Sequence, residues 1–519
     1  MSCHSKVVFK PYSQQQAMLL PPDLDELVDK NHPVRLINAV VENLDITALQ
    51  KTYKGGGTSS YNPRMLLKVL LYAYICNEYS SRRIEELVKR DVHFMWLAAM
   101  AKPDHNTINR FRSDRLKNTI KAVFTEVVQL LVASGHVSLK DVYTDGTKIE
   151  ANANRYTFVW GNAIKTNLQK MGRQLEEIWN YAECVASEEL KDKRPTDFTP
   201  VDAEMVKQTI ATLNDSLKGK PVAKKIKQKL TYAEKNWPAN VEKYQQQQQI
   251  LGDRNSYSKT DPDASFMRMK EDHMKNGQLK AGYNVQISSN SQYVVNFTTH
   301  QTPADTVTLE DHVNDFEQTY ATVPETLTAD AGYGSEQNYH MLDGKGIEAY
   351  VKYTYFDQEQ NGDRSSFHAD QLHYDDKTDT VICPMGQKMR RKDEYSQETK
   401  TGYTQTITTY QAQNCEGCPL RVSCHKQKGN RIVEINHAAR KYKHQAAERL
   451  RSEEGIRRRK QRPVDVEPVF ANWKQNKGFR RFMLRGLPKV NIEIGLISIA
   501  HNLGKWMRLA NNQPKLQMG

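Results

Sequence analysis

Three carboxylates on separate segments are the residues of this chain best suited to metal-ion chemistry. Asp145 is followed by a glycine, and Asp330 is followed by Ala-Gly-Tyr-Gly. Glu467 lies in the run Val-Glu-Pro-Val-Phe-Ala-Asn-Trp-Lys that ends at Lys474. Carboxylates at strand ends beside glycine can present their oxygens to an ion, because glycine lets the backbone and a ligand approach closely. Magnesium sites that act on phosphates use few protein carboxylates and leave positions for water and substrate oxygens.

Three such carboxylates are enough to hold two divalent cations about 4 Å apart. Each aspartate by itself would more often be a turn residue or the N-cap of a helix. Beside a strongly basic segment, the three together favour a site for Mg²⁺ (or Mn²⁺) that acts on a polyanion. We therefore predict that Asp145, Asp330 and Glu467 are both the catalytic residues and the magnesium ligands.

The positive charge of the chain is concentrated at its C-terminal end. The whole sequence has 74 Lys and Arg against 61 Asp and Glu, a net charge of +13. Residues 431–519 hold 20 Lys and Arg against 7 Asp and Glu, and 20 − 7 = +13, so the first 430 residues are neutral. A carboxylate in this field is either a salt-bridge partner or an acid that holds a divalent cation beside a polyanion. The charge favours nucleic acid as the partner, although other basic proteins share it.

Four cysteines form a second group with metal-binding chemistry. Cys383 is followed by Pro-Met-Gly, Cys415 and Cys418 form a Cys-x2-Cys pair, and Cys424 follows. Four thiolates make up the ligand set of a closed, tetrahedral, structural zinc site. We predict a structural Zn²⁺ on these cysteines, with His425 as a substitute ligand. The alternative is four reduced thiols without a metal.

The N-terminal residues 1–138 are predicted to be mainly helical. A strongly apolar helix over 63–76 opens with a proline, which favours the first turn. A second helix is predicted over 82–97 and a third, polar and arginine-rich, over 107–115. This succession fits either a helix-turn-helix DNA reader or an ordinary helical bundle with a solvated last face. The sequence leaves both open.

The middle of the chain has an α/β pattern. Residues 141–150 alternate small, β-branched and aromatic side chains, as a strand does. Two further strands, 280–287 and 293–299, are predicted to form a hairpin. A helix near 306–320 and a strand over 325–330 that runs into another helix complete the pattern.

Two stretches interrupt this α/β pattern. Residues 163–250 are rich in Lys, Glu and Gln and helical in period, and we predict a pair of long helices there. The cysteines mark a second insertion. The predicted organisation begins with a helical N-terminal domain that binds DNA ends (1–138) and the first parts of a core (139–162 and 251–357). A helical insertion (163–250) interrupts the core. A Cys-rich insertion with the zinc site (358–430) and a basic C-terminal part of the core (431–519) follow.

Several classes of protein are excluded by composition. No window approaches the 18 uninterrupted apolar residues that a membrane span needs, so no membrane partner is expected. The N-terminal segment lacks the apolar region of a secretory signal. Seven cysteines in 519 residues are too few for a disulfide framework, which fits a reducing cytoplasm.

Several motifs, in the same order, resemble those of DDE-type transposases of bacterial insertion sequences. In the α/β region they include Tyr-Thr-Asp-Gly-Thr-Lys-Ile-Glu-Ala around Asp145 and Ala-Asp-Ala-Gly-Tyr-Gly around Asp330. All the matching segments there are 143–151, 260–264, 282–286, 329–334, 466–474, 477–482 and 499–503. Residues 61–67 and 104–112 resemble the helical domain that precedes the catalytic core in this group. The resemblance spans most of the chain outside 163–250.

The resemblance implies an α/β, RNase H-like catalytic core with a helical insertion and a zinc-ribbon-like insertion, preceded by an all-α domain. Asp145, Asp330 and Glu467 then become the DDE triad. Related transposases carry the signature Tyr-x2-Arg-x3-Glu-x6-Lys. Glu467 and Lys474 keep the x6 spacing, and seven residues on a helix would place both on one face. Pro463 stands at the arginine position with Arg462 one residue earlier, and the tyrosine is missing.

The same resemblance implies contacts with double-stranded DNA. The residues predicted to make them are Lys474, Arg462, Lys477, Arg480, Arg481, Arg110 and Arg112. A transposase of this kind would bind the terminal inverted repeats of an insertion sequence, as a homodimer, in the bacterial cytoplasm at the nucleoid. It would cleave the ends and join them to target DNA by two-metal phosphoryl transfer.

Two alternatives remain at this point. One is a metal-dependent, RNase H-like nuclease that hydrolyses DNA without strand transfer. The other is an inactive DNA-binding protein derived from a transposase. The three intact acids argue against the inactive protein, and the order of the motifs favours the transposase over the nuclease.

Overall fold

The computed structural model describes residues 23–53, 60–199, 202–269 and 278–512, with side chains up to residue 509. The chain divides into two compact units, Met1–Arg115 with Leu503–Gly519, and Leu116–Asn502. Among the described residues, no helix is both long and apolar enough to cross a membrane.

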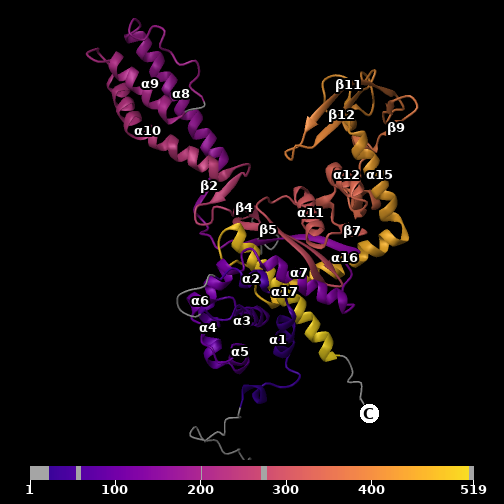
Figure 1. Ribbon diagram of the computed structural model, residues 1–519. Coiled ribbons are helices and arrows are strands. Elements are labelled where there is room, and N and C mark those ends of the chain that lie inside the picture. Colours follow the sequence, from indigo (N-terminus) through magenta and orange to yellow (C-terminus); the bar gives the residue numbers. More distant parts are fainter. Residues whose placement is uncertain (1–22, 54–59, 200–201, 270–277, 513–519) are drawn as a thin grey trace, which may run out of the picture. The chain divides into compact units, whose positions relative to one another are not determined.

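The described part of the first unit is helical (Figure 1), which confirms the prediction of a helical N-terminal region. The helix α3 is buried over most of its length, and the Asn62 side chain caps it by accepting a hydrogen bond from the Arg64 backbone N–H at 2.8 Å. The elements that precede the core unit are η1 (Leu24–Leu27), α1 (Pro33–Asn43), α2 (Thr47–Gln50), α3 (Pro63–Ile75), α4 (Ser81–Arg90), α5 (Val92–Leu97), α6 (His105–Arg110) and the π-helical turn η2 (Phe111–Arg115).

The single helix that we predicted over 82–97 is in fact two helices, α4 and α5. Asp91 lies between them with an extended backbone, and its carboxylate accepts from the backbone N–H groups of His93 and Phe94. A short carboxylate side chain favours such N-cap positions over helix interiors, because it satisfies the free N–H groups of the next helix. The prediction of one helix was therefore wrong at Asp91.

The second unit contains a six-stranded mixed sheet with the strand order β4-β5-β1-β7-β8, and β6 pairs with β5. The strand β1 runs antiparallel to β5 and parallel to β7, and β7 runs parallel to β8. Such a sheet is consistent with a DDE, RNase H-like core. Its strands are β1 (Asp141–Glu150), β4 (Ser265–Arg268), β5 (Leu279–Asn290), β6 (Tyr293–His300), β7 (Thr326–Ala329) and β8 (Glu348–Val351).

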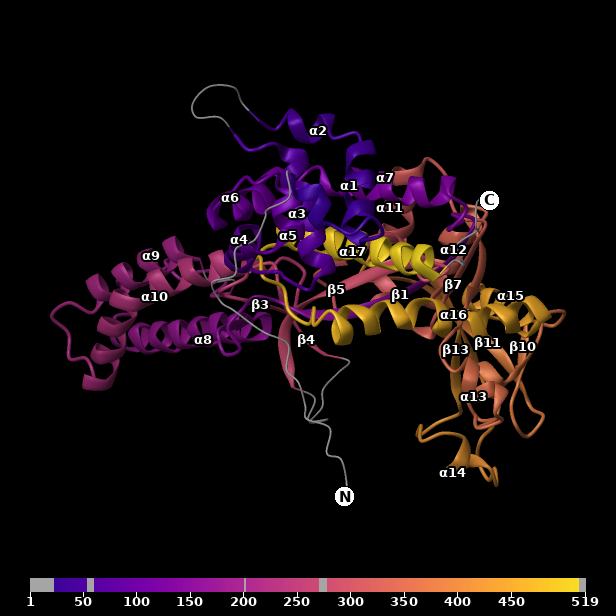
Figure 2. The same ribbon diagram turned by 90° about the horizontal axis from the view of Figure 1, so that it is seen from below.

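The strand prediction for 141–150 and the hairpin prediction for 280–299 are confirmed by β1 and by the β5–β6 pair. The helices of this unit include α7 (Ile120–Ala133), α11 (Leu309–Tyr320), α12 (Glu336–Gly344), α13 (Phe356–Gln360), α15 (His437–Arg451), α16 (Glu453–Ala471) and the part of α17 (Leu487–Asn512) up to Asn502. The helix α16 packs against β1, β5 and β7, and Figure 2 shows it beside β1.

The helical insertion contains three helices rather than the predicted pair. They are α8 (Gly161–Val185), α9 (Ala203–Ser216) and α10 (Lys224–Leu251), which lie side by side in Figure 1 and share a core that includes Trp179 and Trp237. Gly219, with a φ of +78°, and Pro221 separate α9 from α10, since neither suits a helix interior. The insertion is joined to the core through two paired strands, β2 (Phe158–Trp160) and β3 (Ser256–Ser258).

A second sheet lies between β8 and α15 in the sequence. Its five antiparallel strands have the order β13-β12-β11-β10-β9 and bury their own small core. They are β9 (His373–Asp375), β10 (Thr380–Ile382), β11 (Lys388–Glu398), β12 (Thr404–Gln411) and β13 (Ile432–Ile435), and the short helix α14 (Arg421–Cys424) precedes β13. The predicted Cys-rich insertion is thus largely a β-sheet; a zinc ribbon stays a prediction.

A buried arginine anchors α16 to the sheet. The Arg458 guanidinium lies 2.7 Å from Asp141 Oδ1, donates to Thr326 Oγ1 at 2.6 Å and stacks over the ring of Tyr350. Burial raises the pKa of the Asp141 carboxyl, but the hydrogen bonds from Thr326 and Arg458 outweigh it and hold that pKa below its usual value. This interaction connects α16 to β1 and β7 at the start of both strands.

We expect Arg458→Met to lower the free energy of unfolding by about 1–3 kcal/mol, because it removes charged hydrogen bonds and leaves Asp141 without its cation. Urea denaturation measures this change. The effect should be complete above about pH 4 and fade at lower pH, since a lowered folded pKa contributes stability only while the carboxyl is ionised.

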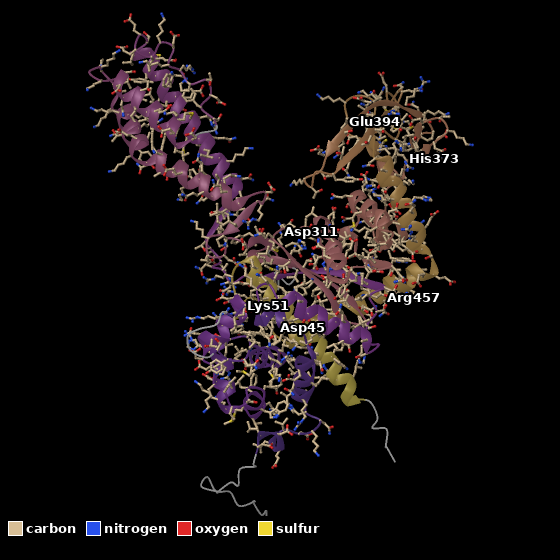
Figure 3. All side chains as sticks on the ribbon, viewed as in Figure 1. Asp45, Lys51, Asp311, His373, Glu394 and Arg457 are labelled. Atoms are coloured by element: carbon tan, nitrogen blue, oxygen red, sulfur yellow. The ribbon has the colours of Figure 1, made fainter. Side chains whose placement is uncertain are left out.

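Arg457→Met is the matched control. Arg457, labelled in Figure 3, is a neighbour on the same helix whose side chain is 64% exposed and pairs with Glu454. Its loss should change the free energy of unfolding by less than about 1 kcal/mol. Equal effects of the two substitutions would contradict the anchoring role of Arg458.

Candidate active site

Two neighbouring parallel strands bring Asp145 and Asp330 to one region of the sheet. In the pairing of β1 with β7, Thr144 lies opposite Ala329. Asp145 and Asp330 are the next residues on the two strands, one within β1 and one directly after β7. Both carboxylates are therefore positioned by backbone pairing and not by mobile loops.

The Arg462 guanidinium joins the two aspartates. Its Nη1 lies 3.1 Å from Asp145 Oδ2, and its Nη2 lies 3.6 Å from Asp330 Oδ2. The side chains of Arg462 and Asp145 are each 14% exposed, whereas that of Asp330 is 48% exposed. A cation between two carboxylates relieves their mutual repulsion, and a divalent ion at the same oxygens would do so with greater charge.

Glu467 lies on the same helix as Arg462 but is not brought to the aspartates. It is exposed, whereas its neighbours Val466 and Val469 are fully buried against the sheet. Five residues along an α-helix correspond to a rotation of about 140° from Arg462. Within the part of the chain that the structure describes, no group of three or more His, Cys, Asp or Glu residues is arranged to hold a metal ion.

The expectation that Glu467 and Lys474 share one helix face is wrong. The α-helical geometry ends at Ala471, and a π-helical turn, η6 (Asn472–Asn476), follows. Each π-helical turn contains more residues than an α-helical one, so side chains after Ala471 shift around the axis. Lys474 is consequently buried, while Glu467 is exposed.

The other predicted DNA contacts differ in exposure. Three of the cations are exposed: Arg110 in the first unit, and Arg480 and Arg481 in the second. The Arg481 guanidinium donates to the carbonyl oxygens of Ala151 and Ala153, next to the end of β1. The roles of these three exposed side chains in DNA binding stay predictions.

Three more predicted contacts, Arg112, Lys474 and Lys477, are buried, with exposed fractions of 3–7%. Arg112 donates to the carbonyl oxygen of Tyr79 at 2.6 Å. Its guanidinium therefore stabilises the helical unit from within. Its role in DNA binding stays a prediction, as do those of the two lysines.

A buried tyrosine, Tyr333, lies three residues after Asp330, and nearby carboxylates affect the pKa of its hydroxyl. Tyr333 is 1% exposed. Burial raises the pKa of its hydroxyl well above the usual value, and the nearby carboxylates of Asp305, Asp145 and Asp330 raise it further. Asp305 thus belongs to the same electrostatic neighbourhood as the two predicted aspartates. We did not predict it from the sequence.

Two glycines in the aspartate motifs are required by close contacts. A Cβ atom on Gly146 would lie 2.4 Å from Gln286 Nε2, and one on Gly334 would lie 2.2 Å from the Lys352 carbonyl oxygen. Real Cβ atoms do not approach that closely, so a larger residue would displace the Gln286 side chain in the first case and the backbone after β8 in the second. The glycines that follow Asp145 and Asp330 therefore keep these backbones in place.

The four predicted zinc ligands line a single small cavity of about 40 Å³, together with His425. Cys383, Cys415, Cys418 and Cys424 are all free thiols. The backbone N–H groups of Gln387 and Arg431 donate to the sulfur atoms of Cys383 and Cys415 at 3.3 and 3.4 Å, and Arg431 Nη1 donates to that of Cys424 at 2.9 Å. Both ring nitrogens of His425 are buried without a hydrogen-bond partner.

Comparison with known proteins found two families. Residues 382–507 match the family described as a transposase DDE domain, and residues 22–114 match the one described as a transposase domain (DUF772). No curated protein matches the chain. The first match contains Arg462, Glu467 and the four cysteines, whereas Asp145 and Asp330 lie outside both matches.

We predict that Arg462→Ala lowers the dissociation constant of Mn²⁺ by about tenfold or more. The guanidinium occupies the same carboxylate oxygens that a cation would take, and its charge repels a second cation. Calorimetric titration with Mn²⁺ measures the constant. Arg457→Ala should leave it unchanged, and unchanged or weaker binding by Arg462→Ala would refute the competition.

Proposed function

The two matches indicate a DDE-type transposase of the insertion-sequence kind, and from this premise we propose that the protein binds the terminal inverted repeats of its element, cleaves the DNA ends and joins them to target DNA. The reaction would take place in the bacterial cytoplasm, on DNA of the nucleoid. The observation that carries the proposal is the placement of Asp145 and Asp330 at the same level of two paired strands.

The donor set at these aspartates fits a divalent cation. Carboxylate oxygens are the ligands that Mg²⁺ and Mn²⁺ prefer, and the two carboxylates share one cationic partner. Held by Asp145, Asp330 and Glu467, such ions would activate a water or a DNA 3′-hydroxyl and stabilise the leaving oxygen. The protein's own part is to hold the two carboxylates in fixed positions. While no DNA is bound, the Arg462 guanidinium offsets part of their negative charge.

Glu467 requires a local change to join the aspartates. Pro463 and Pro468 both lie inside α16, and the π-helical turn follows directly. A proline removes one backbone hydrogen bond from the helix ladder, and π-helical turns often occur at functional sites. We propose that this weakened end of α16 turns Glu467 toward the pair when DNA and cations bind.

DNA phosphates would be held by the exposed arginines. Arg480 and Arg481 project from the segment after η6, close to the end of β1, and Arg110 projects from the helical unit. Contacts of this kind position the backbone and weaken steeply with salt. A homodimer is proposed because both ends of an element must be joined together. The runner-up function, a nuclease without strand transfer, would use the same aspartates.

The decisive experiment supplies Mg²⁺, a donor DNA end and a plasmid target. The wild-type protein should give joined products, whereas nicks without joining would favour the nuclease. Asp145→Asn and Asp330→Asn should each lower the cleavage rate by at least about 100-fold, because each removes a charged ligand from the reacting centre. Their DNA affinity, measured by gel shift, should stay within about threefold of wild type, and undiminished cleavage would refute the proposal.

Glu467→Gln tests the third acid separately. We expect the same loss of cleavage as for the aspartates, because an amide is a poor ligand for Mg²⁺. Glu454→Gln, in the first turn of the same helix, is the control and should keep its activity. Full activity of Glu467→Gln alongside inactive aspartate variants would remove Glu467 from the triad but leave the aspartate pair intact.

We also propose that Cys383, Cys415, Cys418 and Cys424 hold a structural Zn²⁺. The support is their convergence on one cavity, the N–H···S hydrogen bonds, and a buried Arg431 that forms no ion pair with a carboxylate within the described residues. A buried guanidinium needs a counter-charge, which zinc-bound thiolates supply. As the four thiols lie, they are not arranged to hold a metal ion, so the proposed zinc site requires their side chains to move together.

Purified protein should then contain about one zinc ion per chain, since four thiolates form a closed site. Cys418→Ser should lose most of this zinc and melt at a lower temperature, because metal binding contributes to folding. Atomic absorption and thermal melting measure the two effects. Cys184→Ser, at an exposed thiol of α8, is the control. A zinc-free wild type with the melting temperature of Cys418→Ser would refute the site.

A further inference from the structure

An acid outside the predicted triad, Asp305, lies in the short helix η3 (Asp305–Val307) between β6 and α11. We propose that Asp305 is a positioning residue, which holds Asp145 and Asp330 in their relative places through two buried amides and a tyrosine. This inference rests on the proposed cation site at the two aspartates. It assigns Asp305 no contact with DNA or with the reacting atoms.

The first step is the contact between Asp305 and β5. Asp305 Oδ1 accepts hydrogen bonds from Asn284 Nδ2 at 2.7 Å and from Gln286 Nε2 at 3.0 Å. Asn284 and Gln286 are both fully buried, and their alternate positions on β5 place them on one face of the sheet. A carboxylate suits this place because it only accepts hydrogen bonds, and one oxygen can take both amides.

The second step leads from β5 to both aspartates. Gln286 lies opposite Gly146 in the pairing of β1 with β5, in the space that a side chain on Gly146 would fill. The Gln286 Oε1 atom accepts a hydrogen bond from the Tyr333 hydroxyl. Gln286 therefore packs on the backbone next to Asp145 and holds the tyrosine that follows Asp330. Its amide nitrogen donates to Asp305 and, at 3.1 Å, to Asn284 Oδ1, so both acceptors orient this side chain.

The third step secures the segment after Asp330 from the side of η3. Thr306 Oγ1 donates to the Gly332 carbonyl oxygen at 2.7 Å. Asn338 Nδ2 donates to the carbonyl oxygens of Thr306 and Tyr333, at 2.8 and 2.7 Å. The η3 segment thus contacts the 330–334 turn directly through the Thr306 hydroxyl, and indirectly through the hydrogen bonds of Gln286.

The negative charge of Asp305 has no cationic partner among the described residues. Among the described residues, no Lys or Arg forms an ion pair with it, and its charge acts on the Tyr333 hydroxyl together with those of Asp145 and Asp330. A third carboxylate in this place is electrostatically unfavourable unless its acceptor capacity is needed. Two buried amides that both donate to it supply that need, because an unpaired buried amide is unfavourable too.

The test compares Asp305→Asn with Asp305→Ala in the full-length protein bound to a donor end. Asparagine keeps an acceptor oxygen and should retain the cleavage rate within about threefold. Alanine removes the acceptor that both amides share, and misplacement of the aspartates by a fraction of an ångström to 1 Å should lower the rate by about 10- to 100-fold. The concentration of Mn²⁺ that gives half-maximal cleavage should rise for alanine alone.

Asp311→Ala is the matched control. Asp311, labelled in Figure 3, is an aspartate on α11 with a side chain that is 74% exposed, and its removal should change neither the rate nor the Mn²⁺ dependence. A purely structural role for Asp305 would lower the melting temperature of the alanine variant but leave the Mn²⁺ dependence of its folded fraction unchanged. That result would overturn the inference.

Two further outcomes are distinguishable. Equal losses in Asp305→Asn and Asp305→Ala would show that the charge matters rather than the acceptor, and would also overturn the inference. Failure of the proposed function itself appears elsewhere, as a wild-type protein without cleavage or as an active Asp145→Asn variant. An active wild type, an inactive Asp145→Asn and a fully active Asp305→Ala would reject the positioning role alone.

Discussion

The parallel pairing of β1 with β7 is the constraint on which the candidate site depends. Because Thr144 lies opposite Ala329, the following residues emerge at the same level of the sheet, and two acids that are far apart in sequence become neighbours. The carboxylates of these two acids repel each other, and the Arg462 guanidinium, which pairs with both, reduces that repulsion. The helix that carries Arg462 is in turn fixed by Arg458 at the beginning of the same strands.

The surroundings of the pair combine steric and polar constraints. Gly146 admits the Gln286 side chain and Gly334 admits the Lys352 carbonyl group, and Gln286 in turn accepts a hydrogen bond from the Tyr333 hydroxyl. A buried polar network of this kind is stabilising only when each member has its partner. Asp305 completes this network, because it accepts hydrogen bonds from both Asn284 and Gln286.

Some of these features could be predicted from the sequence because they depend on local pattern. The alternation in 141–150 indicates a strand, and the two strands of the hairpin are separated by a polar turn. The strand-end position expected of such acids holds for Asp330, whereas Asp145 lies inside β1. Asn284 and Gln286 lay within a motif that we had noted, two residues apart, which is the spacing of one strand face.

Other features depend on contacts between distant segments and could not be predicted in this way. Asp305 becomes important only when η3 folds over β5 and the 330–334 turn. The direction of the Glu467 side chain depends on the local geometry of α16, which contains two prolines and is followed by a π-helical turn. Residue spacing alone therefore predicts a shared helix face for Glu467 and Lys474 that the structure does not have. The break at Asp91 results from capping, which competes with helix propensity.

The stem formed by β2 and β3 has a consequence for the history of the chain. The polypeptide leaves the core at Phe158–Trp160 and returns at Ser256–Ser258, and these two segments are hydrogen-bonded to each other. A module whose entry and exit points coincide can be lengthened, shortened or exchanged without altering the register of the strands below it. A change in the length of the three helices between them would therefore leave the pairing of β1 with its neighbours unaltered.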